Sequence, residues 1–444
     1  MAHQYVSRVE NLLDPSGNVL LNMSYEEAVE RVVSGDPKRV NEIDGQFAIM
    51  ACEGKTVRMA RSIGRPLRYF LAKLIDGPCL VVAERMDSIF QRLVEMGIAD
   101  QFHPSYTRMV PAHYLMQIEL VGCPDPNPNY QRFFTPQRNS LPADVQSIGQ
   151  NYIAQLSQEC DRWLDTIPSH APIGILFSGG VDSGAVLVTI YDRLLKRGES
   201  PARLKAFTLR VDGALGDATQ AQEFVRKCNM EELLEIIDCT SDDLDWRSTV
   251  RILEDYKPLD VQSGTMAVAL CREIRHRYPD WKYLVDGDGG DENLKDYPIE
   301  DNPELTIRSV LNNLMLYQEG WGVHAIKHSL TYSGGQSRGH IRTSAPASHF
   351  GFCGFSPFAL PRVIEVAESI PFIELTDWSH QKLYALKGEI VRHGIRDVCG
   401  LDMPIFEKRR FQHGAIAKEQ FAKLFPTEET DYRNAFHAQY QKER

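Results

Sequence analysis

The six residues Ser178–Ser183, which read SGGVDS, have the composition and spacing of a loop that binds phosphate. The apolar run Ile173–Phe177 precedes them and a helical pattern follows, so they join a buried strand to the start of a helix. Gly179 and Gly180 allow a sharp turn and a close approach to a ligand. Because the N-terminus of a helix presents free N–H groups, this turn predicts a phosphate site.

The polar side chains of this loop extend the prediction. The hydroxyl groups of Ser178 and Ser183 add hydrogen-bond donors, and Asp182 is available to hold magnesium on the phosphates. No lysine follows the glycines, so the loop differs from the nucleotide loop that ends in lysine and serine or threonine. A glycine turn alone would fit an ordinary connection, but here both flanks favour a binding loop.

A second acidic turn, Asp286–Glu292 with the sequence DGDGGDE, follows the apolar run Lys282–Val285. Alone, such a turn could be a calcium loop or a solvated connection. In a parallel sheet, however, the carboxyl ends of the strands share one edge, and ligands bind there. We therefore expect this turn to face SGGVDS, with Asp291 opposite Asp182 as the magnesium ligands.

The rest of the chain indicates two domains. Beyond Val145, apolar runs alternate with helical patterns, which predicts βαβ units with a parallel sheet, and the pattern beyond Tyr297 is mostly helical. The first 120 residues predict an α+β domain, with helices near 25–34 and 88–97 and with strands at 46–52, 56–62, 67–72, 78–84 and 113–120. Proline and asparagine are dense in 122–144. The predicted domains are therefore 1–121 and 145–444, joined by a linker at 122–144.

Charge and cysteine usage narrow the class of protein. A formal net charge of −11 argues against a protein that binds nucleic acid, because contacts with phosphate groups need clustered lysine and arginine. The nine cysteines form no CxxC pair or Cys/His cluster, which indicates reduced thiols and no zinc site. No signal peptide or membrane-length apolar run is present, so a soluble cytoplasmic protein is expected.

SGGVDS matches the SGGxDS signature of the PP-loop ATP pyrophosphatases. Its pairing with DGDGGDE about a hundred residues later resembles the synthetase domain of the asparagine synthetase and β-lactam synthetase family. The resemblance implies an adenine nucleotide α-hydrolase-like fold that uses ATP and Mg²⁺ and releases AMP and pyrophosphate. The residues that it implies for ATP and pyrophosphate are Leu176, Ser178, Gly179, Gly180, Val181, Asp182, Ser183, Leu209, Asp286 and Gly287.

The C-terminal region extends the resemblance. In PIFEKRRFQHG a lysine precedes a glycine by six residues, which implies that Lys408 stabilises the departing pyrophosphate. The segment KLYALKGEIV resembles the family's K-x-x-L-R helix, with Lys387 in place of the arginine. Asp288 stands where asparagine synthetases carry glutamate and β-lactam synthetases tyrosine, so it could accept a proton from an attacking amine.

The same alignment bears on the acyl substrate. It runs without gaps from Arg342 to the family's PFLD, here Pro357–Leu360, and puts Cys353 and Phe355 at the acid–arginine pair that recognises aspartate and its surroundings. A ring cannot make a bidentate contact with a carboxylate, so aspartate is not the expected substrate. We predict a pocket for an apolar or aromatic acyl group that includes Arg342 and Phe355. Packing in the hydrophobic core would explain the phenylalanines of FGFCGFSPF, residues 350–358, equally well.

Residues 43–71 resemble the glutaminase half of asparagine synthetase, an Ntn-type sandwich whose nucleophile is a cysteine directly after the initiator methionine. Position 2 is Ala2, and the segments that hold glutamine have no counterpart before Asp44. This domain is therefore predicted to be a remnant that cannot release ammonia from glutamine.

Together these features predict an ATP-dependent, AMP-forming ligase that joins a small-molecule carboxylate to ammonia, an amine or an intramolecular amine. The YSGGQSRGH segment, 332–340, is a candidate mobile lid. Adenylation for sulfur transfer and a non-catalytic nucleotide-binding partner subunit remain alternatives. The expected partners are small molecules rather than membranes or nucleic acid, and a homodimer is compatible with the sequence.

Overall fold

The computed structural model describes residues 8–74, 79–119, 128–296, 306–312, 335–406 and 414–440. The chain divides into two compact units. Unit 1 contains the described residues up to Thr135 together with 335–337 and 434–440, whereas unit 2 contains those from Pro136 to 312 and from Arg338 to Arg433.

Unit 1 contains two four-stranded sheets, ordered β1-β7-β6-β8 and β10-β9-β5-β4. Strand β1 pairs with β7 in parallel, and the other pairs in these two sheets are antiparallel. The elements are β1 Arg8–Asn11, β2 Val19–Leu20, α1 Tyr25–Val33, α2 Pro37–Val40, β3 Gly45–Gln46, β4 Ala48–Glu53, β5 Thr56–Arg61, β6 Arg68–Ala72, β7 Cys79–Ala83, α3 Met86–Glu95, β8 Arg108–Met109, β9 Tyr114–Glu119 and β10 Asn129–Arg132.

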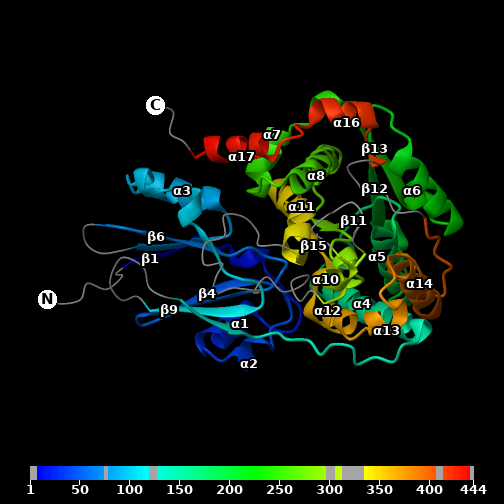
Figure 1. Ribbon diagram of the computed structural model, residues 1–444, viewed down its shortest axis with the longest axis horizontal. Coiled ribbons are helices and arrows are strands. Elements are labelled where there is room, and N and C mark those ends of the chain that lie inside the picture. The colour runs from blue at the N-terminus through cyan, green and yellow to red at the C-terminus, as the bar shows by residue number, and fades with distance from the viewer. Residues whose placement is uncertain are drawn as a thin grey trace. The chain divides into compact units, whose positions relative to one another are not determined.

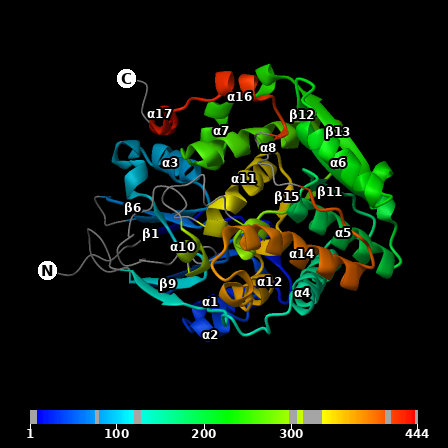
Figure 2. The same ribbon diagram turned by 45° about the vertical axis from the view of Figure 1, so that its right-hand side comes forward.

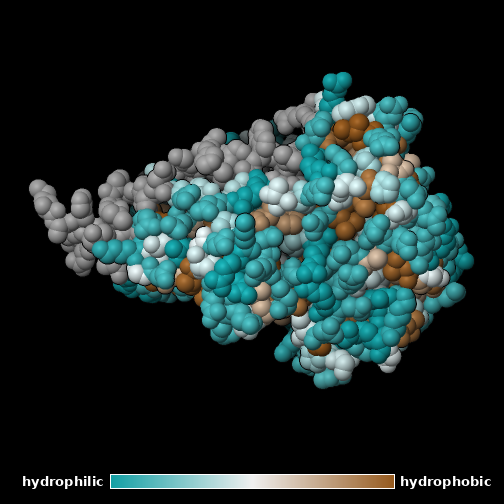
Figure 3. Space-filling view, turned by 90° about the horizontal axis from the view of Figure 1, so that it is seen from below, coloured by the Kyte–Doolittle hydropathy of each residue, from teal (hydrophilic) through white to brown (hydrophobic). Residues whose placement is uncertain are grey.

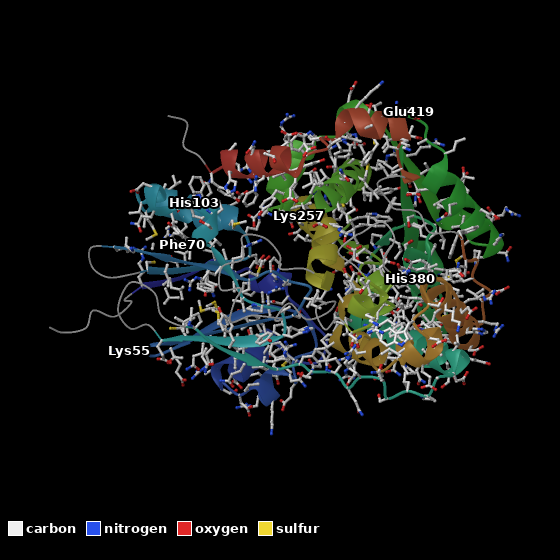
Figure 4. The ribbon with its side chains drawn as sticks, in the orientation of Figure 1. Lys55, Phe70, His103, Lys257, His380 and Glu419 are labelled. Atoms are coloured by element: carbon white, nitrogen blue, oxygen red, sulfur yellow. The ribbon has the colours of Figure 1, made fainter. Side chains whose placement is uncertain are left out.

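Alternation along the strands separates two cores in unit 1. Met50 of β4 lies in a core that also takes in side chains of β7, such as Leu80, whereas its neighbour Ile49 packs with Ala28 and other residues of α1. On the outer face of the other sheet, Phe102 contacts both Phe70, labelled in Figure 4, and a phenylalanine of α3. The layers of unit 1 are therefore helix, sheet, sheet and helix.

Unit 2 is built on a five-stranded parallel sheet with the order β13-β12-β11-β14-β15. Its strands are β11 Ile173–Leu176, β12 Leu204–Val211, β13 Leu234–Cys239, β14 Tyr283–Val285 and β15 Cys353–Phe355. The chain moves outward from β11 through β12 to β13 and then returns to β14 on the other side of β11. This reversal creates a switch point at the carboxyl ends of β11 and β14, where ligands bind in such sheets.

Helices surround this sheet and dominate the C-terminal half, which confirms the predicted fold class (Figure 1). They are α4 Val145–Thr166, α5 Val181–Lys196, α6 Gly216–Lys227, α7 Trp246–Leu253, α8 Pro258–Arg277, α9 Gly290–Asn293, α10 Ile307–Asn312, α11 Gly335–His349, α12 Pro361–Glu368, α13 Phe372–Thr376, α14 His380–Cys399, α16 Lys418–Leu424 and α17 Glu429–Ala438. The surface that Figure 3 presents is mostly hydrophilic, with small separate hydrophobic areas.

Helices α4, α5 and α14 lie together beside β11 (Figure 2). Where α4 and α14 cross, their backbones are in contact. A β-carbon on Gly149 of α4 would lie 2.4 Å from the carbonyl oxygen of Ile390, and one on Gly394 of α14 would lie 2.2 Å from the carbonyl oxygen of Gly149. This crossing fixes the position of α14 relative to the parallel sheet.

Several segments differ from the sequence-based predictions. Strand β10 lies inside the stretch 122–144 that was predicted as a linker, and it pairs with β9. Strands β13 and β15 were not predicted; β13 is a sheet-edge strand whose side chains are mostly half-buried, so it lacks a clear apolar run. Residues 335–340, part of the predicted lid loop, begin helix α11, and 332–334 lie outside the described residues.

Candidate functional site

The SGGVDS loop connects the end of β11 to the start of α5, as predicted. Gly179 has a φ of 73°, a left-handed conformation that favours glycine. A β-carbon at Gly179 would also lie 2.8 Å from the backbone nitrogen of Ala221 in α6. The turn therefore needs glycine at this position for two independent reasons, and it leads directly into the N-terminus of α5 at Val181.

Hydroxyl groups organise the loop from within. The Oγ atoms of Ser178 and Ser183 are 3.2 Å apart, and the backbone N–H of Ser178 donates to Ser183 Oγ at 3.3 Å. The N–H of Gly180 donates to Ser178 Oγ, also at 3.3 Å. These long hydrogen bonds hold the turn in shape while its donors remain able to turn toward an anionic ligand.

The acidic turn after β14 packs directly on this loop. A β-carbon on Gly287 would lie 2.7 Å from the backbone nitrogen of Ser183, and one on Gly290 would lie 2.2 Å from Oδ1 of Asp182. Glycine permits these approaches, to the backbone of α5 at Gly287 and to the Asp182 side chain at Gly290. The structure thus brings together the two motifs that the sequence predicted to face each other.

Lys387 of α14 joins the two motifs. Its Nζ donates to Asp182 Oδ2 at 2.6 Å and to Asp291 Oδ1, and it lies 3.4 Å from Asp296 Oδ2. The side chain is buried. Burial by itself would lower the pKa of Lys387, but the three carboxylates raise it well above its ordinary value, so the ammonium form persists.

The magnesium prediction can be compared with this arrangement. Asp182 and Asp291 approach one ammonium group from two sides, so their oxygens converge on a single cation. Over the described ranges, no group of three or more His, Cys, Asp or Glu side chains has the geometry of a metal site. Magnesium is commonly held by one or two carboxylates together with substrate phosphates, so this pair fits such an ion when a nucleotide supplies further oxygens.

Comparison with known families decides what this site belongs to. The family model described as asparagine synthase matches residues 166–343, which include both glycine-rich turns. Residues 166–343 form an asparagine synthase domain. Proteins with this domain are ATP-using ligases or amidotransferases. No curated protein matches the chain in a sequence search.

Thr343, the last residue of the matched range, links two carboxyl groups of the acidic turn. The hydroxyl group of Thr343 lies 3.0 Å from Asp286 Oδ2 and 2.5 Å from Asp288 Oδ2. Burial and the neighbouring Asp286 raise the pKa of Asp288 well above its ordinary value. Asp288 can therefore carry or accept a proton nearer to neutral pH than an exposed aspartate could.

The two residues predicted for the acyl pocket differ in their surroundings. The side chain of Arg342 is about a quarter exposed, at 27%, and its guanidinium pairs with the buried Asp260 of α8 at 2.7 Å. Phe355 is fully buried in β15, and its ring stacks on Trp163 of α4 with centroids 4.6 Å apart. Phe355 is thus a core residue between the sheet and α4, and the prediction that it lines a pocket does not fit its position.

The residues predicted for adenine also lie at different depths. Leu176, the last residue of β11, is partly exposed, whereas Leu209 is fully buried within β12 opposite Ile237. Leu176 is therefore accessible from the edge of the sheet where the loop begins. Leu209 belongs to the buried interior of the sheet.

Lys408 lies outside the described residues, but the segments on either side of it are described. Gly184 of α5 faces Met403, whose sulfur would lie 3.5 Å from a β-carbon on that glycine. The N–H of Val211, the last residue of β12, donates to the carbonyl oxygen of Ala415 at 2.9 Å. Both flanks therefore lie near the carboxyl edge of the sheet.

Sequence reasoning gave no role to Lys387 or Thr343. The basic residue at 387 in a family helix was the signal available for the first, but its partners Asp182 and Asp291 are distant in sequence. Across the described residues, no helix is long and apolar enough to cross a membrane.

Proposed function

We propose that this protein is an ATP-dependent, AMP-forming carbon–nitrogen ligase. It adenylates a substrate carboxylate, releases pyrophosphate and transfers the acyl group to ammonia, an amine or an amine within the same substrate. The observation that carries this proposal is the contact of the SGGVDS loop with the acidic turn, which Gly287 and Gly290 make possible, inside an asparagine synthase domain.

The first half-reaction follows from the loop. The carboxylate oxygen of the substrate attacks the α phosphorus of ATP, and the bond to the pyrophosphate group breaks. The N–H of Gly180 and the hydroxyl groups of Ser178 and Ser183 bind the pyrophosphate, at the positive end of the α5 dipole. Lys387 and Lys408 supply ammonium groups that stabilise the negative charge on the leaving group. Magnesium, held by Asp182 and Asp291 with the phosphates, would neutralise further charge.

The second half-reaction needs a proton acceptor, because the attacking nitrogen must lose a proton. Asp288 is suited to this role, since its raised pKa brings its basicity toward neutral pH and Thr343 holds its carboxyl group in place. The proposed nitrogen source is ammonia or an amine instead of glutamine. Ala2, at the predicted nucleophile position, lies outside the described residues.

The cellular setting is also part of the proposal. Eight cysteines within the described ranges are free thiols, which supports action in the reducing cytoplasm. The expected partners are a small carboxylate and a nitrogen compound, with a homodimer as the simplest assembly.

The proposal is tested by incubating the protein with magnesium, α-labelled ATP and a metabolite extract. The expected products are AMP and an equal amount of pyrophosphate, both lost in Asp182→Ala. Formation of ADP, or tight ATP binding without turnover, would contradict the proposal and favour a nucleotide sensor or a partner subunit. Transfer of sulfur instead of nitrogen to the activated product would favour the sulfur-transfer alternative.

A further inference from the structure

Lys387 lies where carboxylates from three segments of the chain converge. Asp182 is in the first turn of α5, Asp291 is in α9, and Asp296 follows that short helix. The ammonium bonds to the first two and lies 3.4 Å from the third. Lys387 is buried, whereas the side chains of Asp182 and Asp291 are 21% and 39% exposed, so a ligand can reach the carboxylates that the ammonium joins.

Carboxylates that meet at one point repel each other, and a cation between them relieves this repulsion. Lys387 supplies such a cation between Asp182 and Asp291 in the protein without nucleotide. The lysine is anchored through α14, which the glycine crossing at Gly149 and Gly394 fixes against α4. Its four-carbon stem is nevertheless long and flexible, so the ammonium can move while the helix stays in place.

We propose that Lys387 is a positioning residue that occupies the cation place between Asp182 and Asp291 until the magnesium complex of ATP binds. This inference rests on the proposed function, because it takes the nucleotide to be ATP. When the nucleotide arrives, its phosphates offer Lys387 an alternative negative partner. The ammonium then leaves the carboxylates for the phosphates, and the two carboxylates become ligands of the magnesium ion.

A distinct property follows for the free protein. A divalent ion without nucleotide would have to displace Lys387, which has no phosphate to move to and would remain as a repelling charge nearby. The free protein therefore excludes divalent ions, and ion and nucleotide bind as a unit. A pair of carboxylates without this lysine would bind the ion alone.

The experiment measures binding of Mn²⁺, as a paramagnetic substitute for Mg²⁺, by electron paramagnetic resonance. It uses the full chain with and without α,β-methylene ATP, which cannot be split between its α and β phosphates. The variants are Lys387→Met, which removes the charge, and Lys387→Arg, which keeps it. Lys196→Met is the matched control, because Lys196 is also paired with an aspartate of α5 but is half exposed, at 51%.

The wild-type protein should bind Mn²⁺ tightly only with the ATP analogue. Lys387→Met should bind free Mn²⁺ at least about tenfold more tightly than the wild type does, since a nearby positive charge has been removed. Lys387→Arg and Lys196→Met should exclude the free ion as the wild type does.

Equal affinity of the wild type and Lys387→Met for free Mn²⁺ would overturn the inference. If Lys387→Met does not fold, the wild type alone decides, because tight binding of Mn²⁺ without the analogue would equally overturn it. Failure of the wild type to bind Mn²⁺ even with the analogue would instead count against the proposed ATP site. The two failures are thus distinguishable.

Discussion

Replacing Gly287 by alanine should separate the two motifs of the site. The added β-carbon would lie 2.7 Å from the backbone nitrogen of Ser183, whereas ordinary van der Waals contact begins at 3.4 Å. Since the obstacle is backbone at the start of α5, no side chain can rotate out of the way. The acidic turn must therefore retreat by about 0.7 Å, which carries Asp288 and Asp291 away from the loop.

A displacement of this size is large for catalysis, because a misplacement of about 1 Å can reduce a rate about 100-fold. The overlap should also lower the free energy of unfolding by about 1–3 kcal/mol. The assay is the rate of AMP formation from labelled ATP, with urea unfolding measured on the same samples. We expect Gly287→Ala to form AMP about 30- to 100-fold more slowly while it remains folded.

The matched control is Gly354→Ala in β15, where the added β-carbon would meet its nearest neighbour at an ordinary 3.7 Å. Its activity and unfolding should match the wild type. If Gly287→Ala formed AMP within twofold of the wild-type rate, the close contact of the two turns would not matter for function, and the reasoning would be refuted.

Three further predictions concern buried charge. Burial lowers the pKa of His113 to about 3, so the unfolded state binds a proton first as the pH falls below 6.5. The free energy of unfolding should therefore fall by about 1.4 kcal/mol per pH unit between pH 6.5 and 3, and acid unfolding curves of His113→Asn should lose this dependence. Lys295→Met breaks a buried pair with Glu368 and should lower the free energy of unfolding by about 3 kcal/mol in urea. Asp288→Asn should leave hydroxylamine trapping of the acyl adenylate intact but abolish the rise of amide formation with pH, because the carboxylate form of Asp288 increases as the pH rises through its raised pKa.

His103→Asn changes an exposed histidine and should keep the wild-type acid unfolding curve. Lys227→Met removes an exposed pair with Glu223 and should change stability by less than about 0.5 kcal/mol. A loss of adenylate trapping in Asp288→Asn would move its role to the first half-reaction.

Local sequence patterns predicted much of the fold. Strands such as β4 and β5 alternate between two cores, so their period was visible, and glycines marked both turns of the site. The direction in which a side chain points was harder to predict from the sequence. The alignment identified position 355 but could not reveal that Phe355 faces Trp163 in the core instead of a ligand.

Contacts between residues that are distant in sequence were the least predictable from the sequence. Lys387 is 205 residues from Asp182 and 96 residues from Asp291, and the local sequence of α14 shows a basic position but not its partners. That contact depends on how α14 crosses α4, which is a property of packed backbones. The edge strand β13 was not predicted for a related reason. Its residues are mostly half-buried and show no apolar pattern, so pairing with β12 determines that they form a strand.

The crossing of α4 and α14 has a consequence for genetics. Gly394 is seven residues from Lys387, or about 10 Å along the helix, and neither it nor Gly149 belongs to the loop or the acidic turn. A side chain at either position would push the helices apart and carry Lys387 with α14. A screen for inactive alleles should therefore recover substitutions at these two glycines, and their effect would be mistaken for general misfolding unless nucleotide and metal binding were measured separately.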